Sequence, residues 1–194
     1  MKNSMKWILA LVAVCLVAVG LVLILKPNTP EPEPAVPTFK EYLLEDFEYV
    51  QSLGNDSTHV ALYEVETVLN GNPAEMAAED LAIVSSMTVY AVEDTVFLKT
   101  RTWETGEVVV EKKFGKWLGD FNIEHPDLVM DFDAAVEKLY QAAADSLVTL
   151  PAGDKMTFRR PANADSFTPL YIFGTTGTNF VAVDGVTGEV KPVE

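Results

Sequence analysis

The apolar run from Trp7 to Leu25 constrains this chain more than any other stretch. It is 19 residues long and contains neither a charged residue nor a proline. At the helical rise, a run of this length spans roughly 28 Å, which is close to the hydrocarbon thickness of a bilayer. We therefore predict one transmembrane helix in residues 1–26, which contacts the lipid bilayer through residues 7–25.

The residues that flank this run indicate its orientation. Lys2 and Lys6 precede it, and Lys26 follows it. Basic residues ahead of a span favour a cytoplasmic N-terminus. A cleaved signal peptide has a shorter apolar core and a small-x-small site after it, so an uncleaved signal anchor is the favoured interpretation. We expect a single-pass membrane protein whose remaining residues lie outside the cytoplasm, in the periplasm or at the cell surface.

The chain has one cysteine, Cys15, and it lies inside the apolar run. Lipid attachment is the alternative to a cysteine packed in the anchor helix. Val14 stands where a lipid-attachment signal has a small residue, and ten further apolar residues separate Cys15 from Lys26. The packed cysteine is therefore favoured, and the rest of the chain has no thiol chemistry and no intrachain disulfide.

Residues 27–38 form a predicted linker that is rich in proline. Its prolines are Pro27, Pro30, Pro32, Pro34 and Pro37. Proline at this density favours the extended polyproline II conformation, a semi-rigid spacer of about 3.1 Å per residue. The linker therefore separates the anchor from the folded part.

The folded part is strongly acidic. The whole chain has a formal net charge of −15, and residues 39–194 contain 11 basic and 27 acidic residues. Such a domain repels nucleic acid phosphates and anionic lipid surfaces. Nucleic acid is therefore excluded as a partner.

Residues 39–126 are predicted to form a helix followed by an antiparallel sheet. Thr38 and Glu41 make a capping box ahead of apolar residues at helical spacing. In the run from His59 to Leu69, Ala61, Tyr63, Val65, Thr67 and Leu69 are expected on one face, with Glu64 and Glu66 opposite. Further strands are predicted at residues 83–92, 95–103 and 107–113, the last two as a hairpin.

Residues 127–194 repeat this order. Asp131 or Asp133 can cap a helix with an apolar stripe from Phe132 to Leu147, and strands follow at 155–160, 170–173 and 180–183. The tetrapeptide Thr-Gly-Glu-Val ends both series, at 105–108 and at 187–190. The predicted class is α+β, a helix packed on an antiparallel sheet after one transmembrane helix. A duplication into two αβββ units is left open.

Three features of residues 131–190 carry a family resemblance. They are the Asp133-Ala134-Ala135 helix opening, the Pro169–Phe173 strand, and the hydrophobic–Asp–x–x–Thr–Gly–Glu–hydrophobic ending at Val183–Val190. With these, the second half resembles a PepSY-like domain. The resemblance implies a cystatin-like α+β fold outside the cytoplasm, non-catalytic, and linked with peptidase propeptides and peptidase inhibition. The long first half departs from that family's short single module.

No catalytic, metal or cofactor site is predicted. His59 and His125 lack metal-type spacing, and no G-x-S-x-G, P-loop or dinucleotide motif occurs. Five acidic residues crowd one segment but lack the EF-hand spacing, and helix capping explains the last two. They are Asp120, Glu124, Asp127, Asp131 and Asp133.

Arg159 and Arg160 are the candidate partner-binding residues. They form the one basic Arg-Arg pair of the folded part. Neighbours on a strand point to opposite faces, so one of them is expected to pair with a surface carboxylate.

The predicted function is that of a membrane-anchored, extracytoplasmic, non-catalytic binding protein of PepSY-like type. It is expected to bind or regulate a peptidase or a peptide by strand addition at an exposed sheet edge. Two alternatives are left open. One is a hydrolase that uses a pair of carboxylates, and the other is a structural component of the cell envelope.

Overall fold

The computed structural model describes residues 36–117, 120–162 and 167–193. The predicted anchor at residues 7–25, Cys15 and most of the linker lie outside the described residues. Among the residues that are described, no helix combines the length and the apolar character needed to cross a membrane. The elements below all belong to one unit, Pro37–Glu194.

Two helices are each followed by four strands. The first series is α2 (Phe39–Ser52), β1 (Val60–Leu69), β2 (Ile83–Val92), β3 (Thr95–Thr102) and β4 (Val108–Phe114). The second series is α3 (Phe132–Ala144), β6 (Lys155–Pro161), β7 (Leu170–Phe173), β8 (Phe180–Asp184) and β9 (Val190–Val193). The short elements are η1 (Ala78–Asp80), β5 (Asp120–Phe121) and η2 (Pro126–Leu128).

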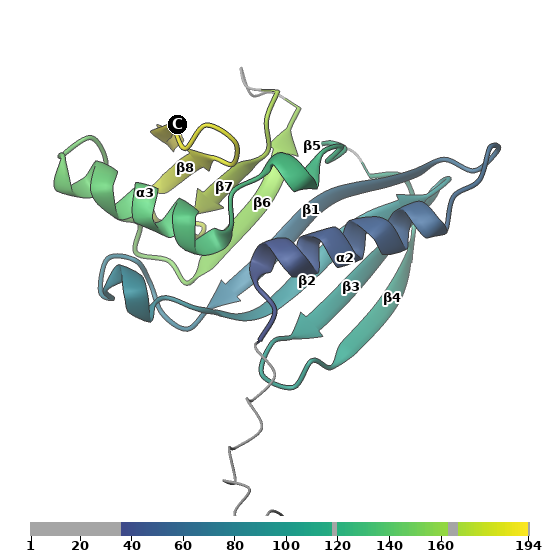
Figure 1. Ribbon diagram of the computed structural model, residues 1–194, viewed down its shortest axis with the longest axis horizontal. Coiled ribbons are helices and arrows are strands. Elements are labelled where there is room, and N and C mark those ends of the chain that lie inside the picture. The colour runs from purple at the N-terminus through teal and green to yellow at the C-terminus, as the bar shows by residue number, and fades with distance from the viewer. Residues whose placement is uncertain (1–35, 118–119, 163–166, 194) are drawn as a thin grey trace, which may run out of the picture. The chain divides into compact units, whose positions relative to one another are not determined.

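The strands form one antiparallel sheet in the order β4-β3-β2-β1-β6-β7-β8-β9, and β5 pairs with β6 beside this path. The two series meet at the centre, where β1 pairs with β6 and Glu64 lies opposite Arg159. Figure 1 shows both helices on one face of the sheet, with α2 crossing the strands of the first series. The predicted α+β class, with helices packed on an antiparallel sheet, is confirmed.

The description of two αβββ units is wrong, because each helix is followed by four strands. The individual strand predictions included all four strands of the first series, β4 among them, but did not include β9 in the second. The strand Val190–Val193 is short and includes Pro192, which cannot donate a hydrogen bond to a neighbouring strand. Such a strand is tolerated at the edge of a sheet, and β9 lies at that edge.

The two Thr-Gly-Glu-Val segments occupy equivalent turns, one between β3 and β4 and the other between β8 and β9. In each turn the glycine amide donates to the carbonyl four residues earlier, at 2.8 Å for Gly106 and 2.9 Å for Gly188. The glutamate amide donates to the threonine Oγ1 at 3.3 Å in both turns. The glycine φ angles are 68° and 75°, in the left-handed region that favours glycine.

The start of each helix is fixed by a side-chain cap. Thr38 Oγ1 accepts from the Glu41 amide at 3.3 Å, and Glu41 Oε2 accepts from the Thr38 amide at 2.8 Å, so the predicted capping box is confirmed. Asp131 caps α3 and accepts from the Phe132 amide at 2.8 Å. The same carboxylate oxygen accepts from the Lys40 amide of α2 at 3.1 Å. One anion therefore serves the N-termini of both helices, where the helix dipole favours negative charge.

Asp131→Ala is expected to lower the free energy of unfolding by about 1–2 kcal/mol, because two helix N-termini lose their acceptor at once. Urea unfolding of residues 37–194, followed by circular dichroism, measures this loss. Asp133→Ala removes an exposed carboxylate from the same turn and is expected to cost less than about 0.5 kcal/mol. Equal losses in the two variants would contradict the shared cap.

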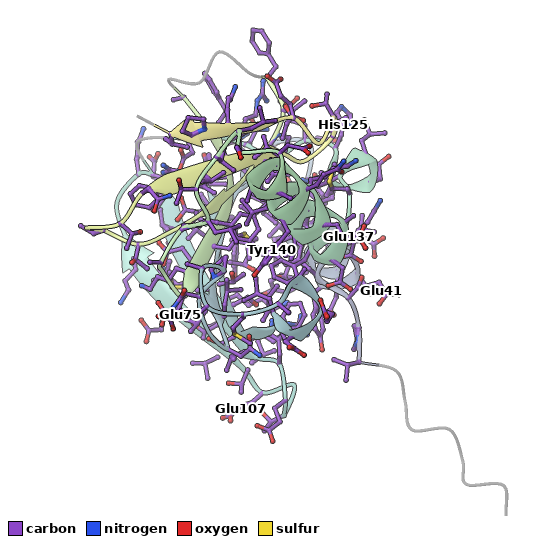
Figure 2. The ribbon with its side chains drawn as sticks, turned by 90° about the vertical axis from the view of Figure 1, so that its left-hand side faces the viewer. Glu41, Glu75, Glu107, His125, Glu137 and Tyr140 are labelled. Atoms are coloured by element: carbon purple, nitrogen blue, oxygen red, sulfur yellow. The ribbon has the colours of Figure 1, made fainter. Side chains whose placement is uncertain are left out.

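The core crosses the boundary between the two series. Phe39 of α2 packs on Phe158 of β6 and Tyr171 of β7, with ring centroids 5.6 Å away in both contacts. Phe158 and Tyr171 lie 4.7 Å from each other. The buried Tyr171 hydroxyl donates to the Met130 carbonyl at 2.6 Å, and burial raises the pKa of Tyr171 well above its usual range. The second tyrosine contact of this kind joins α3 to residues 73–76 through Tyr140 (Figure 2).

The predicted assignment of β1 side chains to the inner face of the sheet is partly wrong. A β-bulge lies between Leu62 and Glu64 and reverses the alternation of side chains. Leu62 therefore enters the core, while Tyr63 is half-buried and stacks on Trp117. Beyond the bulge, Val65 and the rest of the strand follow the expected alternation.

Candidate functional site

The outer edge of β4 is the candidate binding site. The sheet path ends at this strand, and among the described residues no strand pairs with its outer side. Three consecutive valines on it are exposed: Val108 by 41%, Val109 by 52% and Val110 by 47%. Figure 1 shows β4 at the rim of the sheet, and Figure 2 shows Glu107 at the turn that leads into it. An exposed edge rich in β-branched residues is a template for another strand.

The two faces of β4 carry different side chains. Val110 lies opposite Lys99, whose ammonium group contacts α2, so the even-numbered residues of β4 share the helix side of the sheet. The helix-side residues are Val108, Val110 and Lys112, and the open-face residues are Val109, Glu111 and Lys113. Glu111 and Lys113 form an exposed ion pair at 2.7 Å. The charges of Glu111 and Lys113 are therefore paired on the open face, and Val108 and Val110 make the helix side of the edge largely apolar.

The opposite edge of the sheet is a poorer template. β9 has four residues against the seven of β4. Pro192 lies within it and has no amide hydrogen to donate. An incoming strand would find fewer backbone partners there than along β4.

A buried charge network holds α2 against β3, the neighbour of β4. Asp46 of α2 accepts hydrogen bonds from Thr88 of β2 and from Lys99 and Arg101 of β3. The Asp46, Lys99 and Arg101 side chains are only 7–9% exposed. Buried charges require such pairing, and these charges are compensated.

Aromatic rings and a second carboxylate complete this network. The Arg101 guanidinium lies 3.9 Å from the centre of the Tyr42 ring, and Lys99 lies 5.0 Å from the centre of the Tyr49 ring. Glu45 accepts from Arg101 at 2.8 Å, and this hydrogen bond holds the pKa of Glu45 below its usual value. Strand β3 is thus fixed by side chains on its helix side, which gives β4 a firm support.

A second charged cluster lies where β5 pairs alongside the end of β6. Arg159 Nη1 is 3.7 Å from Glu64 Oε2 and 3.6 Å from Asp120 Oδ1. The Glu64 and Asp120 side chains are 6% and 4% exposed, whereas Arg159 is 40% exposed. Burial is the main cause that raises the pKa of Glu64 to about 8, and the carboxyl groups of Asp120 and Glu66 add to it. At pH 7 Glu64 therefore keeps its proton, and one negative charge fewer faces Arg159.

These two carboxyl groups are poorly placed for catalysis on a substrate. Both side chains are less than a tenth exposed. Three cavities among the described residues, of about 920, 230 and 250 Å³, have linings that include neither Glu64 nor Asp120. The raised pKa of Glu64 is explained by its position inside the sheet junction.

Arg159 and Arg160 lie apart, as their adjacent positions on a strand predicted. Arg160 is directed to Glu124 at 3.8 Å, to the Asn122 carbonyl at 3.5 Å and to the Phe121 ring at 5.2 Å. Glu124 is an exposed carboxylate, so the expected surface pair is present. Both arginines contact acceptors of their own chain, and neither lies on the β4 edge.

Asp184, the acidic residue of the hydrophobic–Asp–x–x–Thr–Gly–Glu–hydrophobic ending, shapes a turn. Asp184 accepts from the amides of Val186 at 2.9 Å and Thr187 at 2.8 Å, and from the Thr168 hydroxyl. Burial alone would raise the pKa of Asp184, but these hydrogen bonds outweigh it and hold the pKa below its usual value. Asp184 therefore stabilises the β8–β9 hairpin in its ionised form.

The remaining predicted residues gather no metal site. Among the described residues, no three His, Cys, Asp or Glu side chains lie close enough to hold an ion. His59 lies just before β1, and its amide donates to Glu93 at 2.7 Å. His125 precedes η2, and Asp131 is the α3 cap described above.

Sequence reasoning missed both buried clusters. The partners of Asp46 are separated from it by between 42 and 55 positions in the sequence. Glu64 lies close to Asp120 and to Arg159, which come from other strands of the sheet. The available signal was that charged residues alternate with apolar ones in β1 and β3. A strand with one solvent-exposed face shows the same alternation, so the pattern does not reveal burial.

Comparisons with known proteins add little. No family model matches this chain, and no curated protein matches it. A solved structure, the crystal structure of a "putative lipoprotein" from Clostridium difficile 630, is similar with a TM-score of 0.47 and 11% sequence identity. The match covers 84% of this chain and 95% of that one.

Proposed function

We propose that this chain is a membrane-anchored, extracytoplasmic, non-catalytic binding protein whose second half is PepSY-like. It would capture an extended segment of a peptidase or another protein by strand addition at β4. The observation that carries the proposal is the seven-residue β4 edge, which pairs with no further strand in the described part of the chain and has three exposed valines. In strand addition the backbone supplies affinity, and alternating side chains supply selectivity.

The anchor and the location are part of the same proposal. Residues 7–25 would span the bilayer, and residues 27–38 would hold the folded unit away from it. The basic residues ahead of the span support a cytoplasmic N-terminus. The β4 edge would then face partners in the periplasm or at the cell surface.

We also infer that the two series arose by duplication of one unit. The support is the matching order of a helix and four strands, the meeting of the two first strands at the centre, and the two equivalent Thr-Gly-Glu-Val turns. The PepSY-like ending belongs to the second copy. The first copy has Thr102 where the second has Asp184, so its turn lacks the acidic acceptor.

Observations favour binding over the two alternatives. A carboxylate hydrolase needs acidic side chains that reach a substrate, and Glu64 and Asp120 are buried. A purely structural envelope component would have no need of a long unpaired edge, which carries a risk of aggregation. The three readings are separated by the following experiment.

Val109→Glu is expected to reduce partner capture about tenfold, because a charge on the most exposed of the three valines of β4 opposes apolar strand pairing. The full-length chain is cross-linked in native membranes, purified in detergent, and the captured proteins are quantified by mass spectrometry. Val193→Glu, the same change on the exposed end of β9, is the control and is expected to leave capture unchanged.

Three results would speak against the proposal. Equal capture by the two variants would remove β4 from the binding site. Co-purification of one abundant envelope complex that Val109→Glu leaves intact would favour the structural reading. An unchanged hydrogen-exchange rate of the β4 amides in the presence of a captured partner would exclude strand addition.

A further inference from the structure

We infer that two copies of this chain pair with each other, antiparallel, through β4, and that this pairing closes the edge to other strands. The closing of the edge rests on the proposed function, because the strand that pairs is the strand that would capture a partner. The pairing itself follows from the backbone and the side chains of β4.

The backbone groups of alternate residues leave β4 on its outer side. The Thr102 amide donates to the Glu107 carbonyl at 3.0 Å, so residue 107 directs its carbonyl towards β3. In an antiparallel ladder this direction alternates along the strand. The other odd-numbered residues that pair with β3 therefore also face it, and the amides and carbonyls of Val108, Val110 and Lys112 face outwards.

One alignment of two copies brings these outward groups together. It places Val110 opposite Val110 of the second copy, and Val108 opposite Lys112 in both directions. Each of the three outward amides then has a carbonyl of the other copy as its acceptor. Val108 and Val110 are exposed on the helix side, so α2 leaves them free to pack on the second strand.

The same alignment opposes no like charges. Glu107 lies opposite Lys113 of the second copy, and Val109 lies opposite Glu111. Opposite charges in directly opposed positions stabilise a sheet. Lys113 keeps the ion pair with Glu111 of its own chain, and its ammonium group has three donors, so it also serves the second copy's Glu107. Lys112 already has an interaction of its own, and the alignment requires no charge pairing from it.

The neighbouring alignments are less favourable. Centring the pair on Val109 places Glu107 opposite Glu111 of the second copy, whereas centring it on Glu111 or on Lys112 places that residue opposite itself. Like charges in directly opposed positions destabilise pairing. A shift by one residue places outward backbone groups opposite groups that already bond to β3. The alignment centred on Val110 avoids each of these conflicts.

The resulting pair is closed and reversible. Each chain has one β4, and pairing about a two-fold axis uses this strand of both copies at once, so a third copy cannot add there. The acidic excess of both folded parts opposes association, although salt at physiological strength screens exposed charges beyond about 8 Å. The dimer is therefore the closed form of the edge, and the monomer is the form that accepts another strand.

Disulfide trapping tests the alignment. Val110→Cys and Val109→Cys are each made in the full-length chain with Cys15→Ser, and the proteins are oxidised with copper phenanthroline in detergent. In the inferred pair the two Cα atoms of residue 110 lie about 5.5 Å apart, within the range that a disulfide spans. Those of residue 109 lie diagonally, about 7–8 Å apart, beyond that range.

The expected result is roughly fivefold more cross-linked dimer through residue 110 than through residue 109. The two valines are similarly exposed, at 47% and 52%, so Val109→Cys is a matched control for access of the oxidant. Equal cross-linking through both positions, or more through residue 109, would overturn the alignment.

Reciprocal charge changes test the pairing of Glu107 with Lys113. Copies that carry two different affinity tags are co-purified in detergent at 0.15 M salt. Glu107→Lys in both copies, or Lys113→Glu in both copies, is expected to weaken the dimer about tenfold, because like charges then oppose each other. A mixture of the two variants is expected to restore the dimer, since every lysine again lies opposite a glutamate. A mixture that co-purifies no better than each variant alone contradicts the inferred contact.

Partner capture separates this inference from the proposed function. The oxidised Val110→Cys dimer is expected to capture about tenfold less partner than the same protein after reduction. Absence of the residue-110 cross-link, while capture still depends on Val109, overturns the dimer and leaves strand addition in place. A cross-linked dimer that captures as much as the reduced chain overturns the closing of the edge. Capture that ignores Val109→Glu, with the dimer trapped, overturns the proposed function and the closing of the edge together.

Discussion

Asp46→Ala is expected to lower the free energy of unfolding by about 3–5 kcal/mol. The substitution leaves Lys99 and Arg101 buried, and among the described residues their remaining ionic partner is the exposed Glu45 carboxylate. Removing one partner of a buried ion pair is costly because the remaining charge is neither hydrated nor compensated. Urea unfolding of residues 37–194, followed by tryptophan fluorescence and circular dichroism, measures the loss.

The neighbouring Glu45 provides a matched control. Its side chain is 56% exposed, so Glu45→Ala is expected to cost less than about 1 kcal/mol. A triple variant with Asp46→Leu, Lys99→Met and Arg101→Met is expected to regain much of the stability that Asp46→Ala loses, because it removes all three buried charged groups of this network. If Asp46→Ala loses no more than Glu45→Ala, the network does not hold α2 on the sheet.

Glu64→Gln is expected to flatten the dependence of stability on pH between about 4.5 and 8. The folded protein holds the Glu64 proton up to a pKa of about 8, whereas an unfolded chain releases it near the ordinary value of about 4.5. The contribution of this proton to stability is therefore complete below pH 4.5 and is lost as the pH rises through 8. Glutamine imitates the protonated form and keeps that contribution at high pH.

The expected difference between the two proteins depends on pH. At pH 8 the Gln variant is expected to be more stable than the original protein by about 2–4 kcal/mol, and at pH 4.5 the two are expected to be equal. Urea midpoints measured across this pH range give the result. Glu48→Gln removes a charge from an exposed glutamate of α2 and serves as the control. A difference that stays constant with pH would show that the Glu64 proton is not bound more tightly on folding.

Local patterns in the sequence predicted the elements well. The capping box at Thr38 and Glu41, the helix cap expected at Asp131 or Asp133, and the hairpin at residues 104–106 each depend on residues within one turn of each other. Their hydrogen bonds form wherever the chain adopts that turn. Such features can be recognised without knowledge of the rest of the fold.

Features that depend on distant residues could not be predicted in this way. The pairing of β1 with β6 joins residues about 90 positions apart, and no local pattern indicates which strands meet at the centre of the sheet. Glu64 alternates with apolar residues as a solvent-exposed residue would, yet the sheet junction buries it. The bulge at Leu62 has no proline or glycine to mark it, so the inner face of β1 was assigned one residue out of phase before it.

The candidate site likewise combines features that local patterns predicted with features that depend on distant residues. The exposed valines of β4 were predicted as part of a strand, but its position at the edge is a property of the whole sheet order. Arg159 and Arg160 could be separated onto opposite faces from their spacing alone. The carboxylates that each of them contacts come from other elements and became visible only in the folded unit.

The central pairing of β1 with β6 has a consequence for the chain while it is being made. A ribosome completes α2 and β1–β4 before β6 exists, so the early chain has unpaired backbone along β1 as well as along β4. At that stage the Lys40 amide of α2 lacks its acceptor Asp131, and Phe39 lacks the Phe158 and Tyr171 rings on which it packs. The first series therefore matures only after the second has emerged, and a chain released early would present two open strands to its neighbours.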